Sequence, residues 1–344
     1  MSLTIGITNP QGIILAADSR QTYINNLNQN RVGSDTATKI IPLSPTVAVT
    51  VAGNLYFDIP SPTNPYPKSV LEYITEYSYT LVGNETVQAI ANDLHTFLAA
   101  RYKLEEKLDQ AKQALTTQIK QQGATIIPGS MTAEEDGRIL TALITAKDGQ
   151  QGRVVAPMNG LSLIVAGYDK LGTRDPKQHL FLINIPGKVD HRRRPGDQDQ
   201  YGAVWQGQGD AVTRLLRGFD DRIGMLPFMQ IAGQNMNPEQ VNQQLGGLQY
   251  MVAWQAMTLQ DAIEMSKLLI KTSIAIQKFS SGPVAQPLDI QGVGGPVDVA
   301  IIDPIEGFGW FQNKEIKVIR PEFNKAVPKP AQRRQQHKGK ASKV

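Results

Sequence analysis

The 344-residue sequence predicts an α+β protein built in layers, and three observations predict this class. Apolar or alternating runs of strand length fill residues 3–53 and 138–185. Segments with apolar residues at helical spacing lie between and after these runs, at 68–123 and 258–279. The order of strands, helices, strands, helices and strands is typical of helices packed on antiparallel sheets.

The first fifty residues predict two strand pairs. Residues 3–9 alternate between apolar and polar side chains, and a Pro-Gly turn leads into the apolar strand 12–17. Residues 38–43 and 46–53 form the second pair, in which Val and Ala favour strand structure. A polar loop at 21–37 joins the two pairs.

Helices are expected after this strand region and again near the end of the body. Residues 68–81 have helical periodicity, and a longer helix extends from Asn84, its expected N-cap, to Gly123. The second half of this helix is rich in Lys, Glu and Gln, so we expect a solvated helical arm rather than a coiled coil. Residues 258–279 form a strongly amphipathic helix with Thr258 as its N-cap.

The remaining segments alternate between strands and polar loops. Residues 203–219 predict a strand, a glycine turn and a helix. Residues 189–200 are expected to form a polar loop, and residues 230–250, rich in Gln, Asn and Gly, an inserted loop. Further strands are expected at 138–146, 161–167, 179–185, 294–303 and 307–312.

Composition excludes several classes of protein. The absence of Cys rules out disulfides, thiolate metal sites and a Cys nucleophile. The four histidines show no metal-ligand spacing, so no metal is expected. No apolar run approaches the length of a membrane span, and the first residues lack the pattern of a signal peptide. We therefore expect a cytoplasmic protein without a membrane segment.

The net charge of +4 comes from the end of the sequence. Seven of the 35 basic residues lie from Lys325 onward, where there is no acidic residue, which leaves 28 basic against 31 acidic residues in the rest. Residues 325–344 contain almost nothing to bury, so we expect a disordered basic tail. A solvated tail is favoured over contact with nucleic acid or an acidic partner, and nucleic-acid binding is not expected elsewhere.

Ser2 is the first candidate for chemistry. A small residue after Met1 normally allows an aminopeptidase to remove the methionine, which leaves Ser2 with a free α-amine beside its hydroxyl. An amine with a pKa near about 8 can accept the hydroxyl proton, so the residue combines nucleophile and base. Thr4 is an alternative nucleophile, but its use requires cleavage after Leu3.

Three further positions can support such a nucleophile. The predicted hairpin returns the chain toward Ser2, so Asp18 at its end lies near the first residue. Lys39 opens the third strand. Its positive charge can favour the alkoxide of Ser2, and Asp18 can hold the Lys39 side chain in place. Gly53 ends the fourth strand and can offer its N–H to an oxyanion. The alternatives are a turn-end ion pair between Asp18 and Arg20, a solvated Lys39 and a turn glycine at Gly53.

Together these residues resemble the proteasome β-subunit group of N-terminal nucleophile hydrolases. That family has a nucleophile at its mature terminus and, sixteen positions later, the Asp of a strand end. Ser2 and Asp18, the latter in "GIILAADSR", have the same separation. Lys39 before "IIPL" and Gly53 in "VTVAGN" follow in the family's order. "LIVAGYDK", "WQGQGDA" and "GVGGPVDVAII" resemble later segments, so the similarity extends in patches over most of residues 2–312.

The resemblance implies a fold and a reaction. The fold is a four-layer αββα sandwich, and the reaction is amide hydrolysis through an acyl-enzyme ester without metal or cofactor. The implied roles are Ser2 as nucleophile with its α-amine as base, Lys39 and Asp18 as the supporting pair, Gly53 as oxyanion donor and Arg20 as support of the strand end.

The resemblance also implies a domain and partners. One domain spans residues 2–324, with insertions near 102–158 and 225–256. Family members assemble and act on peptides, so we expect a homo-oligomeric ring or spiral with a peptide or protein substrate. An unfoldase is a candidate partner.

Three positions depart from the family's pattern. The nucleophile is Ser rather than Thr, and Gln208 and Val293 stand where the family has hydroxyl side chains near the terminus. Two alternatives therefore stay open. One is a non-catalytic structural or assembly subunit, and the other is an amidase for small molecules whose cleft the insertions close.

Overall fold

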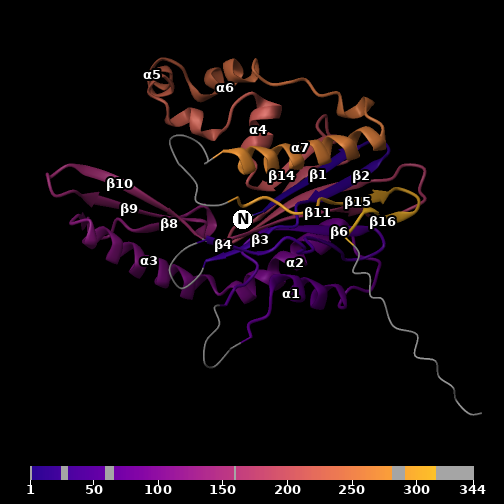
Figure 1. The fold of residues 1–344 in the computed structure, drawn as a ribbon, viewed down its shortest axis with the longest axis horizontal. Helices are drawn as coiled ribbons and strands as arrows, with labels where there is room; N and C mark the ends of the chain where they lie inside the picture. Colours follow the sequence, from indigo (N-terminus) through magenta and orange to yellow (C-terminus); the bar gives the residue numbers. More distant parts are fainter. Residues whose placement is uncertain (1, 25–29, 59–65, 159, 281–290, 315–344) are drawn as a thin grey trace, which may run out of the picture. The chain divides into compact units, whose positions relative to one another are not determined.

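The computed structural model describes residues 2–24, 30–58, 66–158, 160–280 and 291–314. Within these residues the chain is a mixed α+β structure with seven α-helices and several antiparallel sheets, as the sequence predicts (Figure 1). No helix in this described part is both long and apolar enough to cross a bilayer. The basic segment 325–344 lies outside the described residues, so its disorder stays a prediction.

The first of two five-stranded sheets contains the N-terminal hairpin. Its order is β14-β1-β2-β15-β16, and every pair is antiparallel. Asn9 closes the turn between β1 and β2, because its side-chain oxygen accepts hydrogen bonds from the backbone N–H groups of Gln11 and Gly12, both at 2.9 Å. The strands of this first sheet are β1 (Leu3–Asn9), β2 (Gly12–Ala17), β14 (Gly202–Gly207), β15 (Asp298–Asp303) and β16 (Gly307–Gln312).

The second five-stranded sheet has the order β13-β12-β11-β6-β5, again antiparallel. Its edge strand β13 lies within residues 189–200, for which the sequence predicts a loop. That prediction is wrong for the first five residues, because Val189 to Arg193 pair with β12 and complete a hairpin. The strands of this second sheet are β5 (Ile40–Pro42), β6 (Val47–Gly53), β11 (Leu161–Tyr168), β12 (Gln178–Ile185) and β13 (Val189–Arg193).

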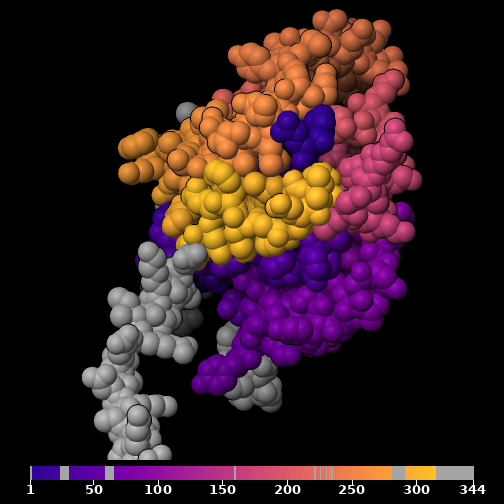
Figure 2. Space-filling view, turned by 90° about the vertical axis from the view of Figure 1, so that its right-hand side faces the viewer, coloured from indigo at the N-terminus to yellow at the C-terminus, as the bar shows by residue number. Residues whose placement is uncertain are grey.

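Helices pack on one face of each sheet, and the other two faces pack together. Ile74 of α1 and Leu94 of α2 lie in one core with Leu163 of the second sheet. Val212 of α4 and Ile270 of α7 lie in another core with the first sheet. A third core contains buried residues of strands from both sheets, and Figure 1 shows strands between the two groups of helices. In the space-filling view, the yellow residues near the C-terminal end of the described chain lie between the orange and the purple parts (Figure 2). The four helices are α1 (Val70–Ser78), α2 (Val87–Tyr102), α4 (Asp210–Arg217) and α7 (Leu259–Phe279).

The helix predicted from Asn84 to Gly123 is two helices. α2 begins at Val87, because the side chain of Thr86, rather than that of Asn84, accepts the capping bond. Lys103 has a left-handed backbone with a φ of 55°, which interrupts the helical hydrogen bonds. The chain then continues as α3 (Leu104–Gln121).

The predicted solvated arm is only partly solvated, because α3 packs on a small separate sheet. Leu115 and Ile119 of α3 are buried with Leu140 and Ala142 of β9. Residues 102–158, expected as an insertion, therefore have a small core of their own. The sheet consists of β7 (Thr125–Ile126), β8 (Thr132–Glu134), β9 (Ile139–Thr145) and β10 (Gln151–Pro157).

Two other predicted loops contain regular structure. The polar loop 21–37 contains a hairpin of β3 (Gln21–Ile24) and β4 (Asn30–Ser34). The loop predicted at 230–250 contains most of α5 (Pro227–Asn235) and α6 (Pro238–Gly246), since Asn237 and Gln240 form a capping box that starts α6. Short 3₁₀ turns lie at Glu135–Gly137, Asp221–Met225 and Trp254–Ala256.

Candidate functional site

The N-terminal hairpin places Asp18 beside the start of the chain. Thr4 pairs with Ala17 across the two strands, so Asp18 lies opposite Leu3. The Leu3 N–H donates to Asp18 Oδ1 at 2.9 Å, and the Asp18 N–H donates to the Leu3 carbonyl at 3.1 Å. Asp18 is fully buried, and Ser2 is 3 % exposed. The carboxylate therefore lies under the backbone next to Ser2.

Lys39 completes a buried ion pair with Asp18. Its Nζ donates to Asp18 Oδ1 at 2.6 Å and to the Arg20 carbonyl at 2.6 Å, and both charged side chains are 0 % exposed. A solvated Lys39, one of the alternatives from sequence, is therefore wrong. Burial lowers the pKa of Lys39, and the nearby carboxylate of Asp18 opposes this shift.

Asp18 has hydrogen-bond donors at both carboxylate oxygens. Oδ1 accepts from the Leu3 N–H and from Lys39 Nζ. Oδ2 accepts from the N–H groups of Arg20 and Gly294 at 3.1 and 3.0 Å. Four donors compensate the buried charge, so the pair holds together β2, the start of β1 and the loop before β15.

The side chain of Arg20, which follows the end of β2, pairs with Asp35. Its guanidinium donates to both oxygens of Asp35, at 2.7 and 2.9 Å, and to Gln291 Oε1 at 2.9 Å. The hydrogen bond with Arg20 lowers the pKa of Asp35, and the same bond raises the pKa of Arg20. The alternative of an ion pair between Arg20 and Asp18 is wrong, since only the Arg20 backbone N–H reaches Asp18.

Gly53 ends β6 in the same corner of the molecule. It has a φ of +103°, and a Cβ at this position would lie 2.5 Å from the Gly160 carbonyl, so glycine is required there. A Cβ on Gly207 would lie 1.9 Å from the Ser2 carbonyl oxygen and 3.4 Å from Ala52 Cβ. Ser2 and Ala52, the residue before Gly53, therefore both lie next to Gly207.

The corner at 207–209 packs on Ser2. The Gln208 N–H donates to the Ser2 carbonyl at 2.7 Å. Gln208 is also held by a residue that the sequence did not single out: Gln277, near the end of α7, donates from Nε2 to Gln208 Oε1 at 3.0 Å. Gln277 Oε1 accepts from the N–H groups of Gly292 and Val293 at 2.9 and 2.8 Å. The Gln277 side chain therefore joins Gln208 to the backbone at Gly292 and Val293.

Gly207→Ala is expected to destabilise the protein more than an alanine at an unconstrained glycine. Gly207 has a φ of +91°, which costs an L-residue about 1–2 kcal/mol. The clash with the Ser2 carbonyl adds about 1–3 kcal/mol of overpacking. Urea unfolding measures the difference. Gly83→Ala is the control, because Gly83 has a φ of +89° and an added Cβ there meets nothing within 4 Å. Equal losses in the two variants would contradict close packing of the corner on Ser2.

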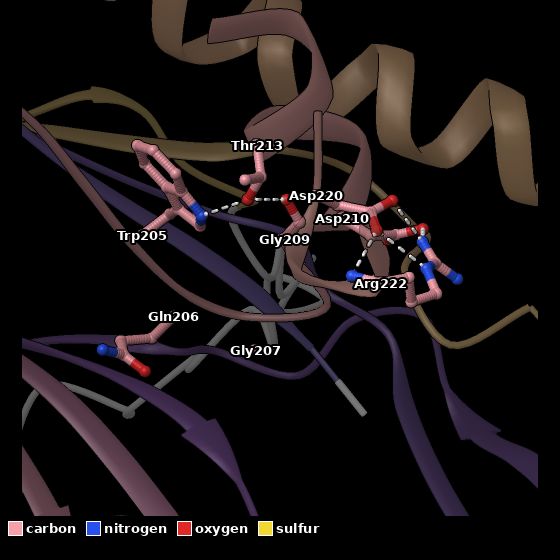
Figure 3. A pocket seen from close by; sticks show the side chains of 8 residues that line it. All are labelled: Trp205, Gln206, Gly207, Gly209, Asp210, Thr213, Asp220 and Arg222. Atoms are coloured by element: carbon pink, nitrogen blue, oxygen red, sulfur yellow. Dashed lines mark hydrogen bonds and ion pairs between the residues drawn. The ribbon is translucent and has the colours of Figure 1, made fainter. Parts of the chain in front are cut away.

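A polar cavity of about 400 Å³ adjoins this corner. Figure 3 shows Trp205 reaching toward Thr213, while Asp210, Asp220 and Arg222 gather at another part of the wall. Arg222 binds the two carboxylates at 3.1 and 2.7 Å, and the hydrogen bonds to Arg222 lower the pKa of Asp220. Gly207 and Gly209, which belong to the corner that packs on Ser2, form part of the cavity wall. Asp18 and Lys39 do not line the cavity.

Among the described residues, no group of three or more His, Asp or Glu side chains can bind a metal. Thr4, the alternative nucleophile, is fully buried within β1, so a substrate cannot reach it in this structure. A comparison of the chain with protein-family models found no match, and a comparison with curated proteins found none either.

Proposed function

We propose that the chain is a peptidase or amide hydrolase in which Ser2, after removal of Met1, is the N-terminal nucleophile. The observation that supports this most is the fully buried pair of Asp18 and Lys39 beside the backbone of Leu3. Burying two charges costs folding free energy, and well-packed apolar side chains in their place often give equal or greater stability. We infer that the role of this pair is the electrostatic field that it produces at Ser2, rather than a contribution to stability.

The proposed reaction follows from the chemistry of these groups. The α-amine of Ser2 takes the hydroxyl proton, and Ser2 Oγ forms a bond to the substrate carbonyl carbon. The positive charge of Lys39 lowers the cost of the developing alkoxide, and the Gly53 N–H is the proposed donor to the oxyanion. The protonated α-amine then gives its proton to the leaving amine as the amide C–N bond breaks. Water attacks the resulting ester, the acid product leaves, and Ser2 is regenerated.

The same proposal includes the finer statement of the fold. We propose that the two helical groups and the two sheets correspond to the αββα sandwich of N-terminal nucleophile hydrolases. The positions of Asp18 at the end of β2 and Lys39 just before β5 support this, since the resembling family has its supporting pair at these places. A homo-oligomeric ring or spiral and an unfoldase partner stay predictions.

A non-catalytic structural subunit is the second candidate. The 3 % exposure of Ser2 favours it, because a substrate must reach the hydroxyl. The amide at Gln208 also favours it, because this side chain replaces a hydroxyl that orients the terminus in the resembling family. An amidase for small molecules is a variant of the first proposal, and a comparison of peptide and small amide substrates separates the two.

Intact-mass analysis after incubation with a β-lactone or an epoxyketone tests the proposal directly. We expect a protein that lacks Met1 and carries one adduct, mapped to Ser2 by peptide fragmentation. The matched control is Ser2→Ala, which also permits removal of Met1 but has no hydroxyl. Retention of Met1, or an equal adduct on Ser2→Ala, contradicts the proposal. Loss of Met1 without an adduct, together with no hydrolysis of peptides or small amides, favours the structural subunit.

A further inference from the structure

Two histidines and an aspartate form a chain of hydrogen bonds on the second sheet. Asp169 follows β11, His179 lies on β12 and His191 lies on β13. His179 Nε2 is 3.2 Å from Asp169 Oδ2, and His179 Nδ1 is 3.1 Å from His191 Nε2. The other oxygen of Asp169 accepts from the Val87 N–H at 2.9 Å, at the first residue of α2. None of these residues belongs to the site around Ser2.

The contacts among Asp169, His179 and His191 fix the orientation of both histidine rings. The two ring nitrogens of His179 face Asp169 and His191, so this ring is held between the two side chains. The ring of His191 interacts with the backbone of Arg193. The His191 ring also stacks on Phe181, with centroids 4.0 Å apart and an interplanar angle of 18°. Burial lowers the pKa of His179 and lowers that of His191 to about 4, so His191 is neutral near pH 7.

His191 lines a polar cavity of about 700 Å³ between α2 and β13. Gln88 and Asn92 of α2 line it from one side, and Lys188 and Arg194 line it from the other. Within the described residues, neither Lys188 nor Arg194 forms an ion pair. The one acidic residue of the lining, Asp190, is neutralised by Arg192 at 2.9 Å. The wall therefore offers two cations that form no ion pair among the described residues, together with two side-chain amides.

We propose that this cavity binds a small ligand through a phosphate group, either as inorganic phosphate or as a phosphomonoester. Lys188 and Arg194 match the charge of the anion, and the amides of Gln88 and Asn92 add neutral donors. Donors from two elements suit a tetrahedral oxyanion better than a planar carboxylate, which has only two oxygens. This inference does not depend on the function proposed for Ser2.

Isothermal titration calorimetry of the full chain with inorganic phosphate and with glycerol 3-phosphate tests the proposal. We expect saturable one-site binding of at least one probe, weakened about tenfold or more by Arg194→Gln or Lys188→Gln, because each variant removes a charged donor. Lys271→Gln is the matched control, since it removes the same charge from the exposed side of α7, and it should change the affinity by less than about twofold. Ser2→Ala should bind like the unaltered protein.

The two probes distinguish the sources of the phosphate group. Tighter binding of glycerol 3-phosphate identifies an organic phosphate, and equal binding identifies the free ion. The absence of saturable binding overturns the proposal. Equal weakening by Arg194→Gln and Lys271→Gln also overturns it, because binding would then follow net charge rather than this cavity. Histidine ring signals in NMR give an independent readout, since phosphate should shift those of His191 and His179.

Discussion

Lys39→Met is expected to lower the free energy of unfolding by about 3–5 kcal/mol, because it leaves the carboxylate of Asp18 buried without its counter-charge. The three remaining donors, from the N–H groups of Leu3, Arg20 and Gly294, carry no full charge. Urea unfolding followed by circular dichroism measures the change. The N-terminal hairpin and the loop before β15 should lose hydrogen-exchange protection first, since both are bonded to Asp18.

Lys68→Met is the control for this substitution. Lys68 also forms an ion pair, with Glu76 at 3.0 Å, but its side chain is 57 % exposed. Removing an exposed pair costs about 0–1 kcal/mol. The double variant Asp18→Leu with Lys39→Met should recover part of the loss, because no unpaired charge then remains. If Lys39→Met and Lys68→Met cost the same, the buried pair does not have the role that we assign to it.

Ser2→Ala is expected to reduce hydrolysis of any accepted substrate by at least about 10³-fold, because the proposed reaction has no other nucleophile. Initial rates on a set of fluorogenic peptides and small amides measure the effect. The side chain of alanine fits the space of Ser2, so the unfolding free energy should change little. A drop in rate with unchanged stability separates a lost nucleophile from a damaged fold.

Ser2→Thr is the informative companion to this variant. It keeps a hydroxyl, and the added methyl group restricts χ1, which pre-orients the nucleophile. We expect Ser2→Thr to retain hydrolysis. Full activity of Ser2→Ala would exclude Ser2 as the nucleophile. No activity in either the unaltered protein or Ser2→Thr, on any substrate of the set, would favour the non-catalytic subunit.

Elements with local patterns could be predicted from the sequence. The alternation at 3–9 and the apolar run at 12–17 became β1 and β2, because the turn residues between them act within four positions. The helix predicted at 258–279 became α7, which begins where Thr258 and Asp261 form a capping box. Such caps and periods depend on residues a few positions apart, so the sequence shows them directly.

Other elements depended on distant contacts and were predicted wrongly. Nothing local marks Lys103 as left-handed, yet it divides the predicted helix into α2 and α3. Leu115 on α3 is buried only because β9 lies against it. The polar residues of β3 and β4 gave no strand pattern, since their pairing comes from backbone hydrogen bonds rather than from a buried face.

The sequence by itself determined the two ends of the candidate site. It indicated Ser2 at the start of one strand and Asp18 at the end of the next, because a tight hairpin joins them. Only the tertiary structure decided what surrounds this site: the partner of Arg20 is Asp35, and Gln277 reaches Gln208 from α7. The same is true of the chain formed by Asp169, His179 and His191. These bonds join residues on different elements, and their formation depends on how sheets and helices pack, which no local periodicity encodes.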